Sequence, residues 1–221
     1  MKKLNGIIFD VDGTLLDSMG MWRDLDRTFL RENGIEPPDD ISDIVKTMTV
    51  ETSSAYFVER FGLQMTPEAV KARIEQLAEE AYRLHLPLKA GAKAFLEQAA
   101  RQEIPCVIAS ANYPALLHAA LDRLGIANCF RGVLTPDTEL AGKHAPDIYL
   151  AAAKLLGTAP AETAVIEDAL HAAETAKAAG FYTVGFRDPY SREDWDALEA
   201  VCDQVTDSWQ ALCDAGFLQY F

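Results

Sequence analysis

The chain has 221 residues, 49% of them hydrophobic and 24% charged, which is typical of globular proteins and excludes disordered and collagen-like classes. Its 20 Lys and Arg residues against 34 Asp and Glu residues give a net charge of −14, so phosphate backbones and anionic lipid would repel it. No apolar run approaches the ~18 residues that a membrane span needs. We therefore expect a soluble protein without a nucleic-acid or membrane partner.

Two local features bear on where the protein works. The first four residues resemble the charged start of a signal peptide, but Asp10 and Asp12 interrupt the apolar stretch behind them and no small-residue cleavage site follows. The four cysteines form no CxxC pair and have no histidine at metal-ligand spacing. Scattered cysteines in a chain with a sizeable core are typical of reduced thiols, so we predict a cytoplasmic protein.

Five short apolar runs predict strands that are buried on both faces, as in a parallel sheet. They cover residues 4–9, 106–109, 132–135, 164–166 and 182–186. Between them lie predicted helices at residues 91–103, 114–124, 146–157 and 169–179. Pro114 and Gly125 are typical first and terminating residues of such a helix. The alternation predicts an α/β fold with a doubly wound, Rossmann-like parallel sheet.

One stretch breaks this alternation, because residues 18–86 contain helical patterns and no convincing strand. A first helix ends before Gly34, and Thr66 with Pro67 predicts the start of another. We expect an inserted all-helical cap domain of residues 17–88 and a catalytic core of residues 1–16 and 89–221. The two linkers, near residues 16–18 and 87–91, can act as a hinge. Residues 191–221 predict further helices, with Ser208 as a candidate N-cap.

Polar residues follow four of the five predicted strands. In chain order they are Asp10 and Asp12, then Ser110 and Asn112 on either side of Ala111, then Lys143, then Glu167 and Asp168. Ligands in open α/β sheets bind at these carboxyl ends, so the four carboxylates should converge. Two charges 4 Å apart repel by ~4 kcal/mol at a surface-like dielectric, so the acids must be protonated, splayed into water or neutralised. A hard divalent cation such as Mg²⁺ prefers this all-oxygen donor set, and together with Lys143 it would admit a phosphoryl group.

Asp10 and Asp12 are two residues apart on an extended strand end, so their side chains point roughly the same way. This spacing suits a division of labour in which one carboxylate attacks phosphorus and the other protonates the leaving oxygen. Gly13 permits the sharp turn that must follow, and Thr14 adds a hydroxyl beside it. Taken alone, this segment is also typical of a simple turn. The polar groups at the other strand ends favour a catalytic site.

At these residues the chain resembles phosphatases of the haloacid dehalogenase superfamily, in the branch with an inserted helical cap that includes phosphoglycolate phosphatases and beta-phosphoglucomutases. The matching segments occur in family order and span nearly the whole chain. They are residues 9–15 (FDVDGTL), Ser110, Gly142-Lys143 with Pro146-Asp147, and residues 166–168 with 176–180 behind them. The sequence departs from the family pattern at His144, where Pro is common, and at Ala169 and Ala172, where Ser and Gly are usual.

The resemblance implies a role for each matching residue. Asp10 would be the nucleophile, and Asp12 the general acid/base. Ser110 would hydrogen-bond the transferring phosphoryl oxygens, and Lys143 would neutralise charge on Asp10 and the phosphoryl group. The predicted metal ligands are Asp10, Asp12 through its backbone carbonyl, Asp168, and Glu167 directly or through water. The predicted substrate-binding residues are Thr14, Ala111 and Asn112.

The function that this resemblance implies is a Mg²⁺-dependent phosphomonoester hydrolase of a small phosphorylated metabolite, with an aspartyl-phosphate intermediate on Asp10. Family dehalogenases and phosphonatases lack the second acid of the first motif, so Asp12 favours phosphate esters. A phosphomutase of the beta-phosphoglucomutase type has the same motifs and remains an alternative. A phosphoacceptor signalling module is a further one, although such receivers are smaller and lack an acid at the position of Asp12. The sequence leaves the substrate and the oligomeric state open.

Overall fold

A computed structural model gives the structure of the chain and describes residues 3–45, 48–136, 140 and 142–221. The chain divides into two compact units. The core unit consists of the N-terminal segment up to Ser18 and of Leu86–Phe221, and the helical unit is Met19–His85. No helix in the described ranges combines the length and the apolar character that crossing a membrane requires.

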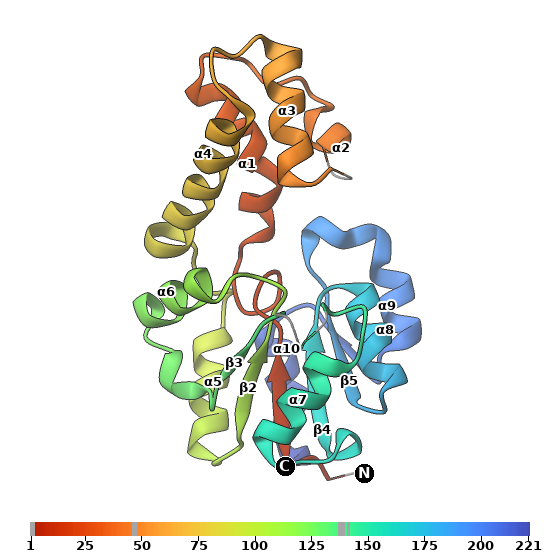
Figure 1. Cartoon of the computed structure of the whole chain (residues 1–221). Coiled ribbons are helices and arrows are strands. Elements are labelled where there is room, and N and C mark those ends of the chain that lie inside the picture. Colours follow the sequence, from red (N-terminus) through yellow and green to blue (C-terminus); the bar gives the residue numbers. More distant parts are fainter. Residues whose placement is uncertain (1–2, 46–47, 137–139, 141) are drawn as a thin grey trace. The chain divides into compact units, whose positions relative to one another are not determined.

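The core unit is built on a parallel sheet of six strands in the order β3-β2-β1-β4-β5-β6 (Figure 1). The strands are β1 (Gly6–Phe9), β2 (Cys106–Ala109), β3 (Val133–Leu134), β4 (Thr163–Glu167), β5 (Tyr182–Phe186) and β6 (Gln204–Thr206). This arrangement confirms the predicted α/β fold with a doubly wound parallel sheet. The first strand of the chain lies in the middle of the sheet, which is the usual place for a site at the strand ends.

The two edge strands are where the sequence prediction was weakest. Residues 191–221 were predicted to form helices only, and this is wrong at β6, which pairs with β5 from Val184 opposite Gln204 to Phe186 opposite Thr206. A strand of three residues, two of them half-buried, carries no periodic pattern, so only its pairing defines it. The opposite edge strand, β3, is half-buried instead of buried on both faces.

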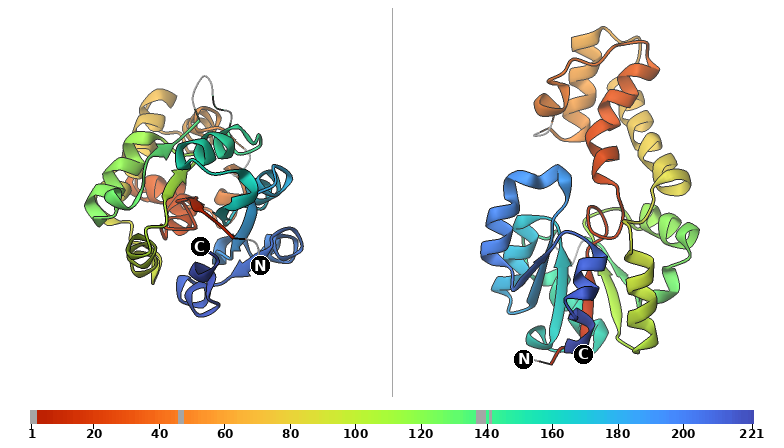
Figure 2. Two further views of the ribbon diagram at one scale, coloured as in Figure 1. Left: turned by 90° about the horizontal axis from the view of Figure 1, so that it is seen from below. Right: turned by 180° about the vertical axis from the view of Figure 1, so that it is seen from behind.

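Successive residues of β1 point to opposite faces of the sheet, and each face is covered by helices. Ile8 belongs to an apolar cluster with side chains of α7 (Asp147–Leu156) and α8 (Leu170–Ala178). Phe9 packs on the other face against Phe95 of α5 (Ala92–Arg101) and Trp209 of α10 (Trp209–Asp214). Figure 1 shows α7 in front of the sheet, and the right-hand view of Figure 2, from behind, shows α10 in front.

The ends of the remaining helices follow local signals. Pro114 opens α6 (Pro114–Leu124) and Gly125 ends it in the left-handed conformation, as predicted. The Ser208 side chain caps α10 by accepting a hydrogen bond from the Ala211 amide at 3.1 Å, which confirms its predicted role. The other elements of the core unit are α9 (Trp195–Val201), η2 (Ala127–Cys129), η3 (Pro160–Glu162), η4 (Pro189–Asp194) and η5 (Phe217–Tyr220).

The helical unit contains only helices in its described residues, as predicted. They are α1 (Met19–Glu32), α2 (Ile41–Val45), α3 (Val50–Phe61), α4 (Pro67–Glu80) and the π-helical turn η1 (Ala81–His85). The unit has its own apolar core, in which the rings of Phe29 and Phe57 stack with centroids 6.0 Å apart. Thr66 caps α4 through the Ala69 amide at 3.2 Å.

The two chain segments that lead to and from the helical unit pair with each other at the edge of the core unit. Leu16 and Leu88 form an antiparallel bridge. The amide of Asp17 donates to the Pro87 carbonyl at 3.0 Å, and the amide of Lys89 donates to the Leu15 carbonyl at 2.8 Å. The start and the end of the insertion therefore lie side by side, so a helical domain can be inserted without disturbing the sheet.

Candidate active site

The strand order brings the predicted site residues together. β1 lies between β2 and β4, with Phe9 opposite Ile108 on one side and Ile166 on the other. The Asp10 amide donates to the Ile166 carbonyl at 3.0 Å, so β1 and β4 stay paired for one residue beyond Phe9. Because the strands are parallel, the residues that follow them emerge at one edge of the sheet.

Three carboxylates form a tight acid cluster at this edge. Asp10, Glu167 and Asp168 each offer one oxygen, and these oxygens all lie within 4.8 Å of one another. The three residues are 5%, 1% and 6% exposed, so water cannot separate their charges.

Lys143 reaches the acid cluster from the loop before α7. Its ammonium group donates to Oδ1 of Asp10 and, at 2.5 Å, to Oε1 of Glu167. One ammonium against three carboxylates leaves a charge of −2 if all are ionised. In the described part of the chain, Oδ2 of Asp10 and Oε2 of Glu167 are buried without a hydrogen-bond partner. The residual charge and the unpaired oxygens fit a divalent cation, and carboxylate oxygens are ligands that Mg²⁺ prefers together with water.

The protonation of the acid cluster reflects the same excess of charge. Burial raises the pKa of Asp10 and raises the pKa of Glu167 to about 7, while Lys143 opposes both shifts. Burial and the neighbouring Asp10 and Glu167 hold the pKa of Asp168 well above its usual range. Burial alone would lower the pKa of Lys143, but Asp10 and Glu167 outweigh it, so the ammonium stays charged. Without a metal ion, these carboxyl groups therefore bind protons more readily than free ones, and a cation would compete with those protons.

Asp12 lies beside the acid cluster, and its carboxylate is not one of the cluster's three. One oxygen, Oδ1, accepts a hydrogen bond from the Ser18 hydroxyl at 2.6 Å. The other, Oδ2, accepts one from the Asn112 side-chain amide at 2.9 Å. Two donors from different loops thus orient this carboxylate, which a general acid/base requires.

The remaining predicted residues differ in how they relate to the site. Ser110 is buried at the end of β2, and its hydroxyl accepts a hydrogen bond from the backbone amide of Asn112 at 3.2 Å. Ala111 is exposed in the same loop. Thr14 is fully buried, and in the described structure its hydroxyl has no partner, while its carbonyl accepts from the Trp209 indole at 3.2 Å. The structure therefore brings Ser110 and Asn112 to the strand ends and leaves the Thr14 side chain inside the core unit.

Two residues at the site were not predicted. Ser18 lies three residues after the first motif, and only the folded loop reveals its contact with Asp12. Tyr149 lies on the buried face of α7, and its hydroxyl donates to Oε1 of Glu167 at 2.7 Å. The signal that could have revealed Tyr149 is a polar hydroxyl on the apolar face of a predicted helix that begins shortly after Lys143.

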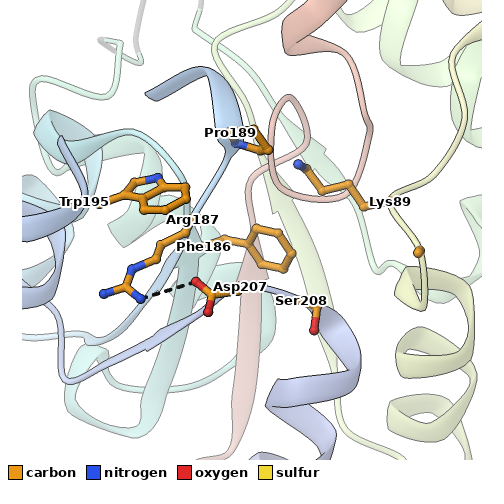
Figure 3. A pocket seen from close by; sticks show the side chains of 8 residues that line it. Lys89, Phe186, Arg187, Pro189, Trp195, Asp207 and Ser208 are labelled. Atoms are coloured by element: carbon orange, nitrogen blue, oxygen red, sulfur yellow. Dashed lines mark hydrogen bonds and ion pairs between the residues drawn. The ribbon is translucent and has the colours of Figure 1, made fainter. Parts of the chain in front are cut away.

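A separate cavity of about 430 Å³ lies near the carboxyl ends of β5 and β6 (Figure 3). It is lined by Lys89, Ala90, Phe186, Arg187, Pro189, Trp195, Asp207 and Ser208. Both cations in it are paired: Lys89 with Asp188 at 2.5 Å, and Arg187 with Glu199 at 2.5 Å and Asp207 at 3.3 Å. None of the predicted site residues lines it, so the acid cluster is the better candidate for a phosphoryl site.

Known proteins share this sequence pattern and this fold. A family model described as haloacid dehalogenase-like hydrolase matches residues 4–180. The chain is 28% identical over 197 residues to a beta-phosphoglucomutase of Bacillus subtilis, covering 82% of this chain and 83% of that protein. It is 28% identical over 199 residues to a fructose-1-phosphate phosphatase of Escherichia coli, covering 84% and 98%.

A solved structure of a candidate beta-phosphoglucomutase from Thermotoga maritima has the same fold, with a TM-score of 0.86, 21% identity and coverage of 97% and 100%. At this identity the structural likeness supports the fold alone, whereas the family model spans both the motifs and the strands that carry them. The chain belongs to the haloacid dehalogenase-like hydrolase family and is a phosphatase-type enzyme of that family.

Proposed function

We propose that the protein is a Mg²⁺-dependent phosphomonoester hydrolase of a small phosphorylated metabolite that works through an aspartyl phosphate on Asp10. The observation that carries the proposal is the buried acid cluster. Lys143 forms ion pairs with Asp10 and Glu167, and each of these two carboxylates keeps one oxygen without a hydrogen-bond partner in the described structure. An acidic protein can bind a phosphoryl group here only if cations neutralise the carboxylates. Mg²⁺ held by Asp10, Glu167 and Asp168 would supply that charge and draw electron density from the phosphoryl oxygens.

In the first half-reaction, a carboxylate oxygen of Asp10 attacks phosphorus and the bond from phosphorus to the ester oxygen breaks. Asp12 gives its proton to that leaving oxygen, so the alcohol departs neutral. The contacts of Asp12 with Ser18 and Asn112 support this role, because they hold its carboxylate two residues beyond the nucleophile. Lys143 touches Asp10, which suits it to stabilise the charge that gathers there and on the phosphoryl group.

In the second half-reaction, water attacks the phosphorus of the aspartyl phosphate. Asp12, now ionised, takes a proton from the water, the bond from phosphorus to Asp10 breaks, and inorganic phosphate leaves. Ser110, buried at the neighbouring strand end, is suited to donate its hydroxyl proton to a phosphoryl oxygen in both steps. The cycle returns Asp10 as a carboxylate and Asp12 as an acid.

The test is the release of inorganic phosphate from a panel of sugar phosphates, nucleotides and phosphoglycolate, with and without Mg²⁺. Asp10→Asn should reduce turnover by ~10³-fold or more, because the amide cannot replace the nucleophile. Asp122→Asn is the matched control, since Asp122 is exposed on α6 and should leave turnover unchanged. Substantial turnover by Asp10→Asn, or full activity in a chelator, would refute the mechanism.

A second candidate is a phosphomutase, which the similarity to the beta-phosphoglucomutase of Bacillus subtilis favours. Both activities use the same first half-reaction and differ in whether water or a second substrate hydroxyl takes the phosphoryl group. Incubation with a hexose 1-phosphate separates them. A phosphomutase would yield the isomeric 6-phosphate without net phosphate release, and a hydrolase would yield phosphate.

A further inference from the structure

Tyr149 is fully buried, and its hydroxyl reaches the acid cluster. The residue lies in the first turn of α7, and its ring belongs to the apolar cluster beneath that helix, 6.2 Å from the ring of Phe181. Burying a hydroxyl without a partner costs free energy, and this one donates to Oε1 of Glu167 at 2.7 Å. A phenylalanine would fill the same space at no polar cost, so the hydroxyl points to a purpose at Glu167.

Two donors hold the same oxygen of Glu167. Lys143 donates to Oε1 at 2.5 Å and Tyr149 donates to it at 2.7 Å. Both donors come from one short segment, six residues apart, so their relative positions are set by the start of α7. The other oxygen, Oε2, is buried and has no hydrogen-bond partner among the described residues. The carboxylate of Glu167 is therefore fixed by one oxygen and left with the other unsatisfied.

We propose that Tyr149 is a positioning residue of the metal site, which occupies Oε1 of Glu167 together with Lys143 and so reserves Oε2 for the metal ion or a water molecule bound to it. The inference rests on the proposed function, because it takes the acid cluster to bind Mg²⁺. Hydrogen bonds from such outer residues orient metal ligands and commonly change metal affinity by 10- to 100-fold.

The test is the binding of Mg²⁺ to the purified protein, measured by isothermal titration calorimetry without substrate. Tyr149→Phe removes one oxygen and keeps the ring in the apolar cluster, so we expect Mg²⁺ to bind about 10-fold more weakly. Tyr182→Phe is the matched control, because Tyr182 is half-buried on β5 and its hydroxyl lies 3.5 Å from Gln204. Its removal should leave the Mg²⁺ affinity unchanged.

A second measurement distinguishes positioning from packing. The Mg²⁺ concentration for half-maximal hydrolysis of para-nitrophenyl phosphate should rise by the same factor in Tyr149→Phe, while the turnover at saturating Mg²⁺ recovers. A loss of packing alone would lower the thermal unfolding temperature without this shift in metal dependence.

Each outcome bears on the inference. An unchanged Mg²⁺ affinity in Tyr149→Phe overturns it, even if the wild-type enzyme hydrolyses phosphate esters with Mg²⁺ and the proposed function stands. An absence of Mg²⁺ binding to the wild-type protein overturns it together with the metal part of the proposed function. Equal losses in Tyr149→Phe and Tyr182→Phe also overturn it, because the effect would then not come from Glu167.

Discussion

Lys143 offers the sharpest test of the charge balance at the site. Its side chain is buried and contacts the buried side chains of Asp10 and Glu167. Lys143→Met keeps most of the side-chain volume and removes the positive charge. The change leaves two buried carboxylates without their ammonium partner, in a cluster whose third member is Asp168.

The expected cost follows from these contacts. Removing one partner from a buried ion pair typically destabilises a protein by 3–5 kcal/mol. Two such contacts do not double the loss here, because a carboxyl group whose pKa rises takes up a proton instead of remaining charged. Relative to the ionised unfolded state, that protonation costs about 1.4 kcal/mol for each unit by which the ambient pH exceeds the usual pKa of the group. We therefore expect the free energy of unfolding of Lys143→Met to be about 3–5 kcal/mol lower than that of wild type near pH 8 without metal.

The pH dependence gives the signature. Burial raises the pKa of Glu167 from its usual value of 4.5 to about 7 in the folded wild-type protein. Between pH 4.5 and pH 7 the folded protein therefore binds a proton that the unfolded chain has lost, and the free energy of unfolding falls as the pH rises through this range. Without Lys143 the folded pKa lies higher, and the fall continues above pH 7. The deficit of the variant should therefore be largest at pH 8 and shrink toward pH 5.

The assay is urea denaturation of both proteins at pH 5, 6, 7 and 8 in a chelator. Lys154→Met is the matched control, because Lys154 is exposed on α7 and its replacement should change stability by no more than about 0.5 kcal/mol. A Lys143→Met protein as stable as wild type at pH 8, or a deficit that does not vary with pH, would refute the reasoning.

Two further predictions concern other parts of the chain. In the helical unit, burial raises the pKa of Asp26 from 3.8 to about 6, so the native state loses stability as the pH rises between these values. Asp26→Asn should therefore stabilise the protein by about 1–2 kcal/mol at pH 7 and not at all below pH 4. Urea denaturation without such a gain at pH 7 would contradict this prediction. At the active site, Ser18→Ala removes a donor to Asp12, so kcat for para-nitrophenyl phosphate should fall about 10-fold with KM little changed, and a change in KM alone would contradict a positioning role.

Local signals in the sequence were enough to locate most elements of the fold. The apolar runs matched β2 and β5 to the residue, and the turn and cap residues Pro114, Gly125, Thr66 and Ser208 marked helix ends. These signals are reliable because a cap or a left-handed residue is decided by hydrogen bonds and backbone angles within one turn. The order of the acids, the serine and the lysine along the chain also predicted one shared site.

The sequence did not determine how those residues bond to one another. The predictions that Asn112 and Thr14 bind substrate stay predictions. The structure adds that the side-chain amide of Asn112 donates to Asp12, one hundred residues earlier, and that the Thr14 side chain is buried in the core unit. The helix pattern could have marked Tyr149 as a candidate, but it does not reveal that the hydroxyl donates to Glu167.

The sequence by itself determined which polar residues follow each strand, because strand ends and helix caps are set by neighbours along the chain. The tertiary structure alone decided that β6 exists, that β1 lies between β2 and β4, and that one ammonium serves two carboxylates. Strand pairing joins residues that are far apart in the chain, so the local sequence does not specify it. Burial surrounds a carboxyl group with charges from distant residues, so its neighbours along the chain do not determine its pKa.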